Sequence, residues 1–141
     1  MSIAAFTHTK RFVVAFGAAF ALAALQPISA HHSFAAEFDA NKPITLKGTV
    51  TRIEWANPHI WVYLDVKQDE GGAQAWQCEG GPPNTLTRNG WTKDSLKVGD
   101  QVTIDGVLAK DGSKTCNARL VKLPDGRSVF AGSSGDTERR P

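Results

Sequence analysis

The groups best suited to chemistry in this chain are three histidines, two of which follow a candidate cleavage site. Residues 28–30 (Ile-Ser-Ala) are typical of a signal-peptidase site, and His31-His32 comes next. Cleavage after Ala30 would give His31 a free α-amine beside its imidazole, and His32 would add a second ring. Together with His59, these nitrogens suit Cu(II) best among divalent ions. The pattern predicts a copper site at His31, His32 and His59.

The competing interpretation is that His31-His32 is a frayed, solvated end. A single histidine after a proline, such as His59, is often a capping or packing residue. If the site is real, a neighbouring carboxylate, Glu37 or Asp39, would supply an oxygen ligand or orient one ring. Copper affinity in vitro alone does not separate the two interpretations, because an amine and two imidazoles bind copper in many contexts.

Aromatic residues form a second candidate site. Trp61 and Tyr63 share one face of a predicted strand, and Trp76 lies on the next one. Such rings can stack a sugar, a peptide aromatic or an apolar small molecule. The alternative is that they fill a small barrel or cover its open end. The predicted partners are therefore a metal ion, a small ligand or an envelope protein.

Catalytic motifs are absent from the sequence. It contains no GxSxG, no P-loop and no free-thiol Cys-His arrangement, and its carboxylates are scattered. We expect a binding module and not an enzyme.

The first 30 residues predict export. Residues 1–11 have no acidic residue and end in Lys10-Arg11, and residues 12–25 form an apolar run of 14 residues. A spanning helix needs about 20 residues, so the run fits a signal peptide and not a membrane anchor. We expect a periplasmic or secreted protein with no membrane insertion after processing.

Charge and cysteine content agree with that compartment. The leader holds two of the 16 basic residues and none of the 14 acidic ones, so the mature part is formally neutral. This balance argues against nucleic-acid binding. In an oxidising compartment Cys78 and Cys116 are expected to form a disulfide. Thiolate metal ligation is the alternative, and the lack of a CxxC pair argues against it.

Apolar alternation and turn residues predict an all-β domain over residues 31–131, followed by a disordered tail over residues 132–141. A change of phase near Gly48 predicts a bulge or bend in the first strand. The predicted strands cover residues 44–55, 60–67, 74–79, 102–108, 115–123 and 128–130, with a short helix over residues 83–89. Three strands, a helix and two further strands are the order of a five-stranded OB-like barrel. An immunoglobulin-like sandwich is the alternative, although it would need about seven strands.

Four segments also resemble a family of exported bacterial proteins known only as a domain of unknown function. They are HHSFAAEFD, WANPH, NTLTRNGWTKDSLKVGD and LPDGR, and the resemblance covers about residues 31–130. It implies an exported small β-domain with no established activity, and it transfers no catalytic residue.

Overall fold

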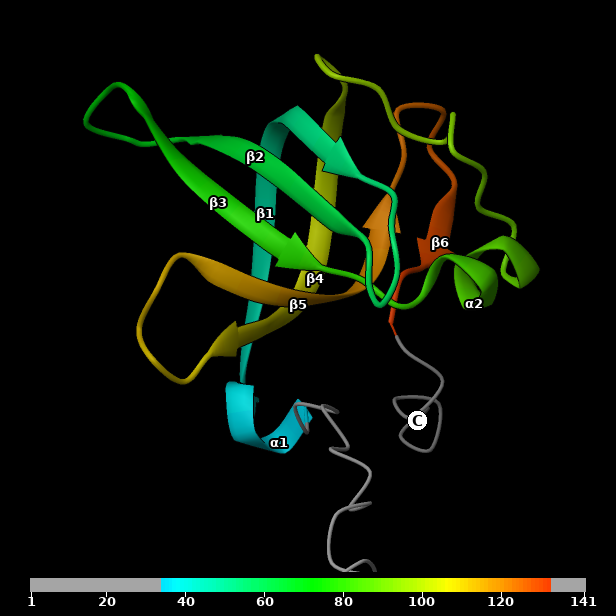
Figure 1. The fold of residues 1–141 in the computed structure, drawn as a ribbon. Coiled ribbons are helices and arrows are strands. Elements are labelled where there is room, and N and C mark those ends of the chain that lie inside the picture. The colour runs from blue at the N-terminus through cyan, green and yellow to red at the C-terminus, as the bar shows by residue number, and fades with distance from the viewer. Residues whose placement is uncertain (1–33, 133–141) are drawn as a thin grey trace, which may run out of the picture. The chain divides into compact units, whose positions relative to one another are not determined.

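The computed structural model describes residues 34–132, which form two short helices and six strands (Figure 1). The predicted signal peptide, His31, His32 and the tail beyond Gly132 lie outside the described residues. Within residues 34–132, no helix is long and apolar enough to cross a membrane. In chain order the elements are α1 (Phe34–Glu37), β1 (Phe38–Glu54), β2 (Trp61–Lys67), β3 (Ala73–Glu79), α2 (Pro83–Arg88), β4 (Gln101–Ala109), β5 (Thr115–Lys122) and β6 (Ser128–Phe130).

The strands form one sheet in the order β3-β2-β1-β4-β5-β6. Neighbours in this order are antiparallel, whereas an additional pairing joins β3 to β5 in parallel. That pairing closes β1, β2, β3, β5 and β4 into a ring of five strands, and β6 is attached to β5. The predicted all-β fold is confirmed, with a short helix after the third strand and a return strand over residues 128–130.

β1 is 17 residues long because it serves two neighbours. Its first half pairs with β4 and its second half with β2. A Cβ atom at Gly48 would lie 2.8 Å from the carbonyl oxygen of Asp65, so glycine permits the close approach of β2 where the two halves meet. The bulge that the change of phase predicted near Gly48 lies slightly later, between Val50 and Arg52.

The segment before β1 forms the short helix α1, which the sequence analysis did not predict. The Phe34 and Phe38 rings stack with their centroids 5.7 Å apart. The Lys110 ammonium donates to the Ala35 carbonyl at 2.6 Å, and the Lys110 amide donates to the Glu37 carbonyl at 2.8 Å. A four-residue helix is too short to be stable alone. α1 therefore depends on contacts with the end of β4 that no local pattern reveals.

The core fills the ring and continues under α2. Val62 of β2 and Ile104 of β4 are 2% and 0% exposed. Leu86 of α2 is fully buried, and Trp91 donates its indole N–H to the Phe130 carbonyl at 2.9 Å. Leu86 and Trp91 belong to the same cluster of buried side chains as the strand residues, so α2 shares the core of the ring.

The predicted disulfide lies where the ring closes. Cys78 of β3 and Cys116 of β5 are register partners in the parallel pairing, with Cα atoms 4.5 Å apart. Both side chains are fully buried. The bond therefore joins the two strands whose contact converts the sheet into a ring.

We expect Val62→Ala and Ile104→Ala each to lower the free energy of unfolding by about 1–3 kcal/mol, because buried methyl groups are lost and a cavity remains. Lys67→Ala, at an exposed position of β2, is the matched control and should change it by less than about 0.5 kcal/mol. Chemical denaturation measures all three. Equal effects from the three substitutions would contradict the assignment of strand faces.

The unreduced, denatured protein should show no thiol that reacts with a labelling reagent. Reduction should lower the free energy of unfolding by about 2–4 kcal/mol, because the cross-link restricts the unfolded chain. Thiol counting by mass spectrometry and denaturation with and without reductant provide the two measurements. Two reactive thiols before reduction would refute the bond.

Candidate functional site

Outward-facing side chains of β2, β3 and β5 form two rows across the strands. They alternate with the inward-facing core residues Val62, Cys78 and Cys116. One row joins Trp61, Glu79 and Asn117, and the other joins Tyr63, Gln77 and Thr115. We call these six residues the outer face. Three of its polar members, Glu79, Thr115 and Asn117, are less than 9% exposed, which is unusual for polar side chains outside a core.

His59 lies at one end of the outer face. The adjacent Ile60 donates its amide to the Gly81 carbonyl at 3.2 Å and accepts from the Gly80 amide at 2.9 Å, which holds this loop against the end of β3. His59 Nδ1 pairs with the Glu79 carboxylate, and the imidazole remains 36% exposed. A carboxylate at Nδ1 favours the tautomer whose Nε2 carries the lone pair, as in many metal-binding histidines.

Glu79 is the carboxylate beside His59, and the sequence analysis did not identify it. The structure pairs Asp39, one of the two carboxylates proposed from the sequence, with Lys42 at 3.8 Å. Glu79 reaches His59 because β3 ends beside the loop that follows β1. No local spacing in the sequence could have shown that contact.

Two buried side-chain atoms of β5 lack hydrogen-bond partners in the described part of the chain. Asn117, the register partner of Glu79, is 6% exposed, and Asn117 Oδ1 lacks a hydrogen-bond partner in the described part of the chain. Arg119 Nε, two residues further along, is buried and also lacks one within that part. Arg119 lies over the Phe34 ring, with 5.9 Å from Cζ to the centroid. Phe34, the first described residue, is therefore close to this end of the outer face.

Residues 34–132 contain no group of three or more His, Cys, Asp or Glu side chains placed to hold a metal ion. Of the predicted copper ligands, only His59 belongs to this part of the chain. A site with three nitrogen ligands would therefore require His31 and His32.

The three predicted aromatic ligand-binding residues do not lie together. Trp76 is buried in the core beside its register partner Leu64, on the other side of the sheet from Trp61 and Tyr63. One face of the Tyr63 ring is covered by Arg52, whose Cζ lies 3.7 Å from the ring centroid. The Trp61 side chain, in contrast, is half-buried and lines a pocket.

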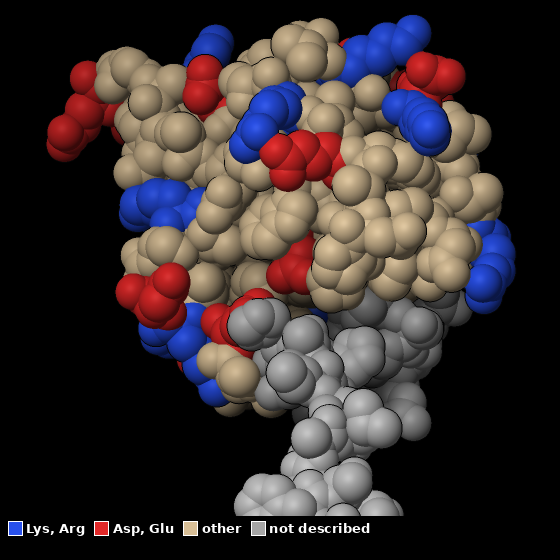
Figure 2. Space-filling model, in the orientation of Figure 1, with Lys and Arg blue, Asp and Glu red and all other residues tan. Residues whose placement is uncertain are grey.

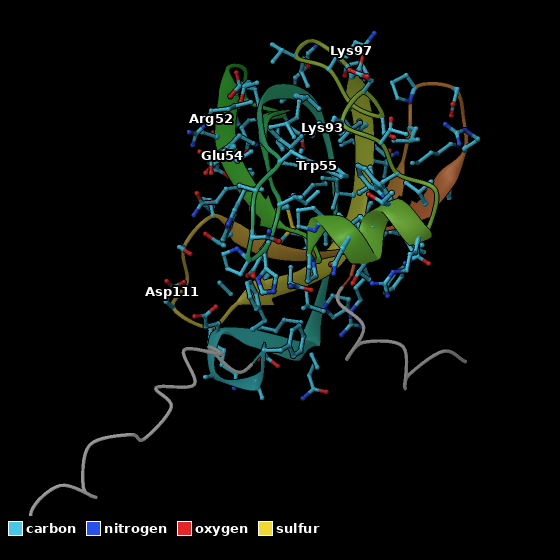
Figure 3. All side chains as sticks on the ribbon, turned by 45° about the vertical axis from the view of Figure 1, so that its right-hand side comes forward. Arg52, Glu54, Trp55, Lys93, Lys97 and Asp111 are labelled. Carbon is cyan, nitrogen blue, oxygen red and sulfur yellow. A yellow bond between two sulfur atoms is a disulfide. The ribbon has the colours of Figure 1, made fainter. Side chains whose placement is uncertain are left out.

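Arg52 and Glu54 lie at the end of β1 (Figure 3), and Arg52 is the register partner of Tyr63 on β2. The Arg52 guanidinium pairs with Glu54, and the Tyr63 hydroxyl donates to Glu54 Oε2 at 3.2 Å. Burial raises the pKa of Tyr63. The Glu54 charge and this hydrogen bond raise that pKa further, while Arg52 opposes them.

Trp61 lines an open pocket of about 620 Å³ between α1, the outer face and the β4–β5 loop. The sequence revealed Trp61 but not the pocket, because its other walls come from segments far apart in the chain. Among the residues around it are Glu37, Phe38, Gln77, Asp111 and Thr115. Asp111 lies in the β4–β5 loop (Figure 3).

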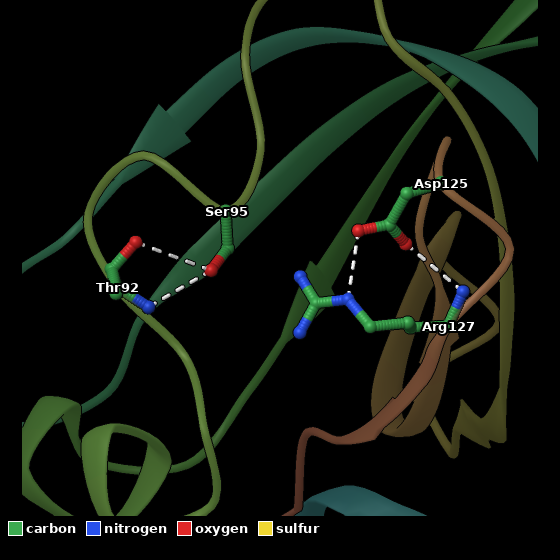
Figure 4. Close-up of polar contacts among 4 residues, drawn as sticks. All are labelled: Thr92, Ser95, Asp125 and Arg127. Atoms are coloured by element: carbon green, nitrogen blue, oxygen red, sulfur yellow. Dashed lines mark hydrogen bonds and ion pairs between the residues drawn. The ribbon is translucent and has the colours of Figure 1, made fainter.

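Two other polar clusters are turn contacts (Figure 4). The Thr92 amide donates to Ser95 Oγ at 2.8 Å in the loop after α2. In the turn between β5 and β6, Asp125 accepts from the Arg127 amide and Nε at 2.9 and 2.7 Å. These bonds lower the pKa of Asp125. Acidic and basic side chains are interspersed on the face in Figure 2, which shows no large patch of one sign.

A family model matches residues 19–118. The chain belongs to DUF6152, a family of unknown function. The DUF6152 match includes His59, Trp61, Glu79 and Asn117 but ends before the LPDGR turn. The resemblance to a domain of unknown function is thereby confirmed. Comparison with curated proteins and with solved structures found no match.

The only tyrosine of this DUF6152 chain should titrate above its ordinary pKa of about 10. Glu54→Gln should lower the midpoint, and Arg52→Ala should raise it, because one removes a negative and the other a positive charge. Phenolate absorbance measures each shift. The raised pKa stabilises the fold below pH about 10, and this contribution is lost as pH rises through the folded-state pKa. A midpoint at or below that of free tyrosine would contradict the environment described.

Proposed function

We propose that this chain is an exported, periplasmic binding module that holds a transition metal, copper, through His31, His32 and His59. The observation that carries the proposal is the pairing of His59 Nδ1 with the buried Glu79 carboxylate. A histidine that ligates a metal through one nitrogen commonly donates its other N–H to such a carboxylate. The role proposed is binding without catalysis.

An OB-like barrel is the finer fold that we propose. The ring order β1-β2-β3-β5-β4, the parallel β3–β5 contact and the position of α2 between β3 and β4 support it. In such barrels the outer side of the second and third strands, flanked by loops, is a frequent binding surface. The outer face defined above occupies that position.

Cleavage upstream of Phe34 is the processing that we propose. Cleavage after Ala35 would remove His31, His32 and Phe34, and with them the stack on Phe38. It would also remove the carbonyl that accepts the Lys110 ammonium. These contacts support a mature protein that retains residues 34–37, and cleavage after Ala30 leaves the terminal amine on His31.

A ligand set shared between the terminus and His59 is the donor arrangement that we propose. The amine and ring of His31, the ring of His32 and His59 Nε2 would supply nitrogen ligands suited to Cu(II).

Metal-free protein beginning at His31 should bind one Cu(II) per chain. One extra residue before His31 should weaken binding by about tenfold or more, because the free amine moves away from the imidazole while every side chain stays. His59→Ala should have a similar effect, and Glu79→Gln should weaken binding about tenfold. Affinity should fall below pH about 6, because protons compete for imidazole and amine. Competitive calorimetric titration measures these constants, and intact mass establishes the terminus.

Gln74→Ala is the matched control, since this partly buried residue of β3 is remote from His59 along the strand. It should leave copper affinity within about twofold. If neither the extra residue nor His59→Ala changes the copper affinity, the proposed site shared by His31, His32 and His59 is rejected.

Small-ligand binding beside Trp61 is the second proposed function. The pocket of about 620 Å³ favours it, because ligand sites in proteins commonly have volumes of about 300–1,000 Å³. This function needs neither His59 nor a metal.

A further inference from the structure

We infer that the pocket beside Trp61 accepts a neutral polyhydroxylated ligand of mono- or disaccharide size. This inference rests on the second proposed function and names its ligand class. Three features of the pocket support it: the Trp61 ring on one side, several hydrogen-bonding side chains, and an excess of negative over positive charge among the lining residues.

The aromatic wall belongs to a rigid strand. Trp61 is paired on both sides, with Glu54 of β1 and Glu79 of β3, so its backbone is fixed. Its side chain is half-buried and lines the pocket, in contrast to the core rings of Trp76 and Trp91. An indole supplies a large apolar surface at little entropic cost. The C–H face of a sugar ring is a suitable partner for such a surface.

Hydrogen-bonding groups from β3, β5 and the β4–β5 loop line the pocket. Gln77 donates its Nε2–H to Thr115 Oγ1 at 3.0 Å, which leaves the Gln77 amide oxygen as an acceptor and the Thr115 hydroxyl as a donor. Asp111 accepts from the Ser113 amide at 2.9 Å. Hydrogen bonds from the Ser113 side chain and from its amide lower the Asp111 pKa, so its carboxylate is ionised at neutral pH. Hydroxyl groups both donate and accept and therefore match this mixed set.

Charge around the pocket disfavours an anionic ligand. Two carboxylates, Glu37 and Asp111, line it together with one ammonium, that of Lys110. The Lys110 ammonium already donates to the Ala35 carbonyl. A purely apolar ligand is disfavoured too, because it would dehydrate these polar groups without replacing their hydrogen bonds. A neutral ligand with many hydroxyls avoids both costs.

The experiment uses the mature protein in EDTA, so that no metal contributes. The probes are N-acetylglucosamine, maltose and N,N′-diacetylchitobiose, with indole as a neutral aromatic without sugar hydroxyls and citrate as an anion. Ligand-observed NMR detects binding, and calorimetry gives the affinity. At least one saccharide should bind, and Trp61→Ala should weaken it by about tenfold or more, whereas Trp61→Phe should retain part of the affinity.

Tyr63→Ala is the matched control, because Tyr63 is on the same strand and outer face but does not line the pocket. It should leave saccharide affinity within about twofold, and thermal melts check that each variant is folded. Indole binding that depends on Trp61, without binding of any saccharide, would overturn the ligand class and leave the second proposed function standing. No binding by any probe would overturn both. Saccharide binding that ignores Trp61→Ala would place the ligand elsewhere and reject the pocket.

Discussion

The pairing of β3 with β5 is the constraint on which the rest of this structure depends. Without it the six strands would form an open sheet with exposed edges at β3 and β6. With it, one side of five strands encloses a core, and the other side brings Glu79 next to Asn117. The disulfide between Cys78 and Cys116 links the same two strands covalently. The core, the outer face and the candidate sites are thus consequences of one closure.

Glycine makes the ring possible at two places where backbones approach closely. Gly48 lies where β1 changes partners, and a Cβ at Gly106 would be only 2.1 Å from the Asn117 carbonyl oxygen. The register between β4 and β5 shifts beside Gly106, so this close approach accompanies another irregularity in the ring. Strongly bent strands need such bulges to close on themselves.

Strands and turns could be predicted because their signals are local. Alternation along β2 and the Asp-Gly turn at 125–126 needed no knowledge of distant segments. α1 was not predicted, because its stability comes from Lys110, which lies more than 70 residues away in the chain. The same reason explains why His59 could be identified from its residue type whereas Glu79 could not. Only the closure of the ring places Glu79 beside His59. Trp76 shares a face of β3 with Cys78, so the alternation of that strand already points it toward the core, where the structure buries it.

The position of the disulfide in the sequence also determines which incorrect disulfides the chain can form while it is being synthesised and folds. Cys78 emerges 38 residues ahead of Cys116, and these are the only two cysteines. Until the β5 segment has been synthesised, the Cys78 thiol has no disulfide partner, correct or incorrect, within its own molecule. The only erroneous bond available is to another molecule, so faulty oxidation yields covalent dimers and mixed adducts, never scrambled monomers. Once the ring forms, both sulfurs are buried and this exposure ends.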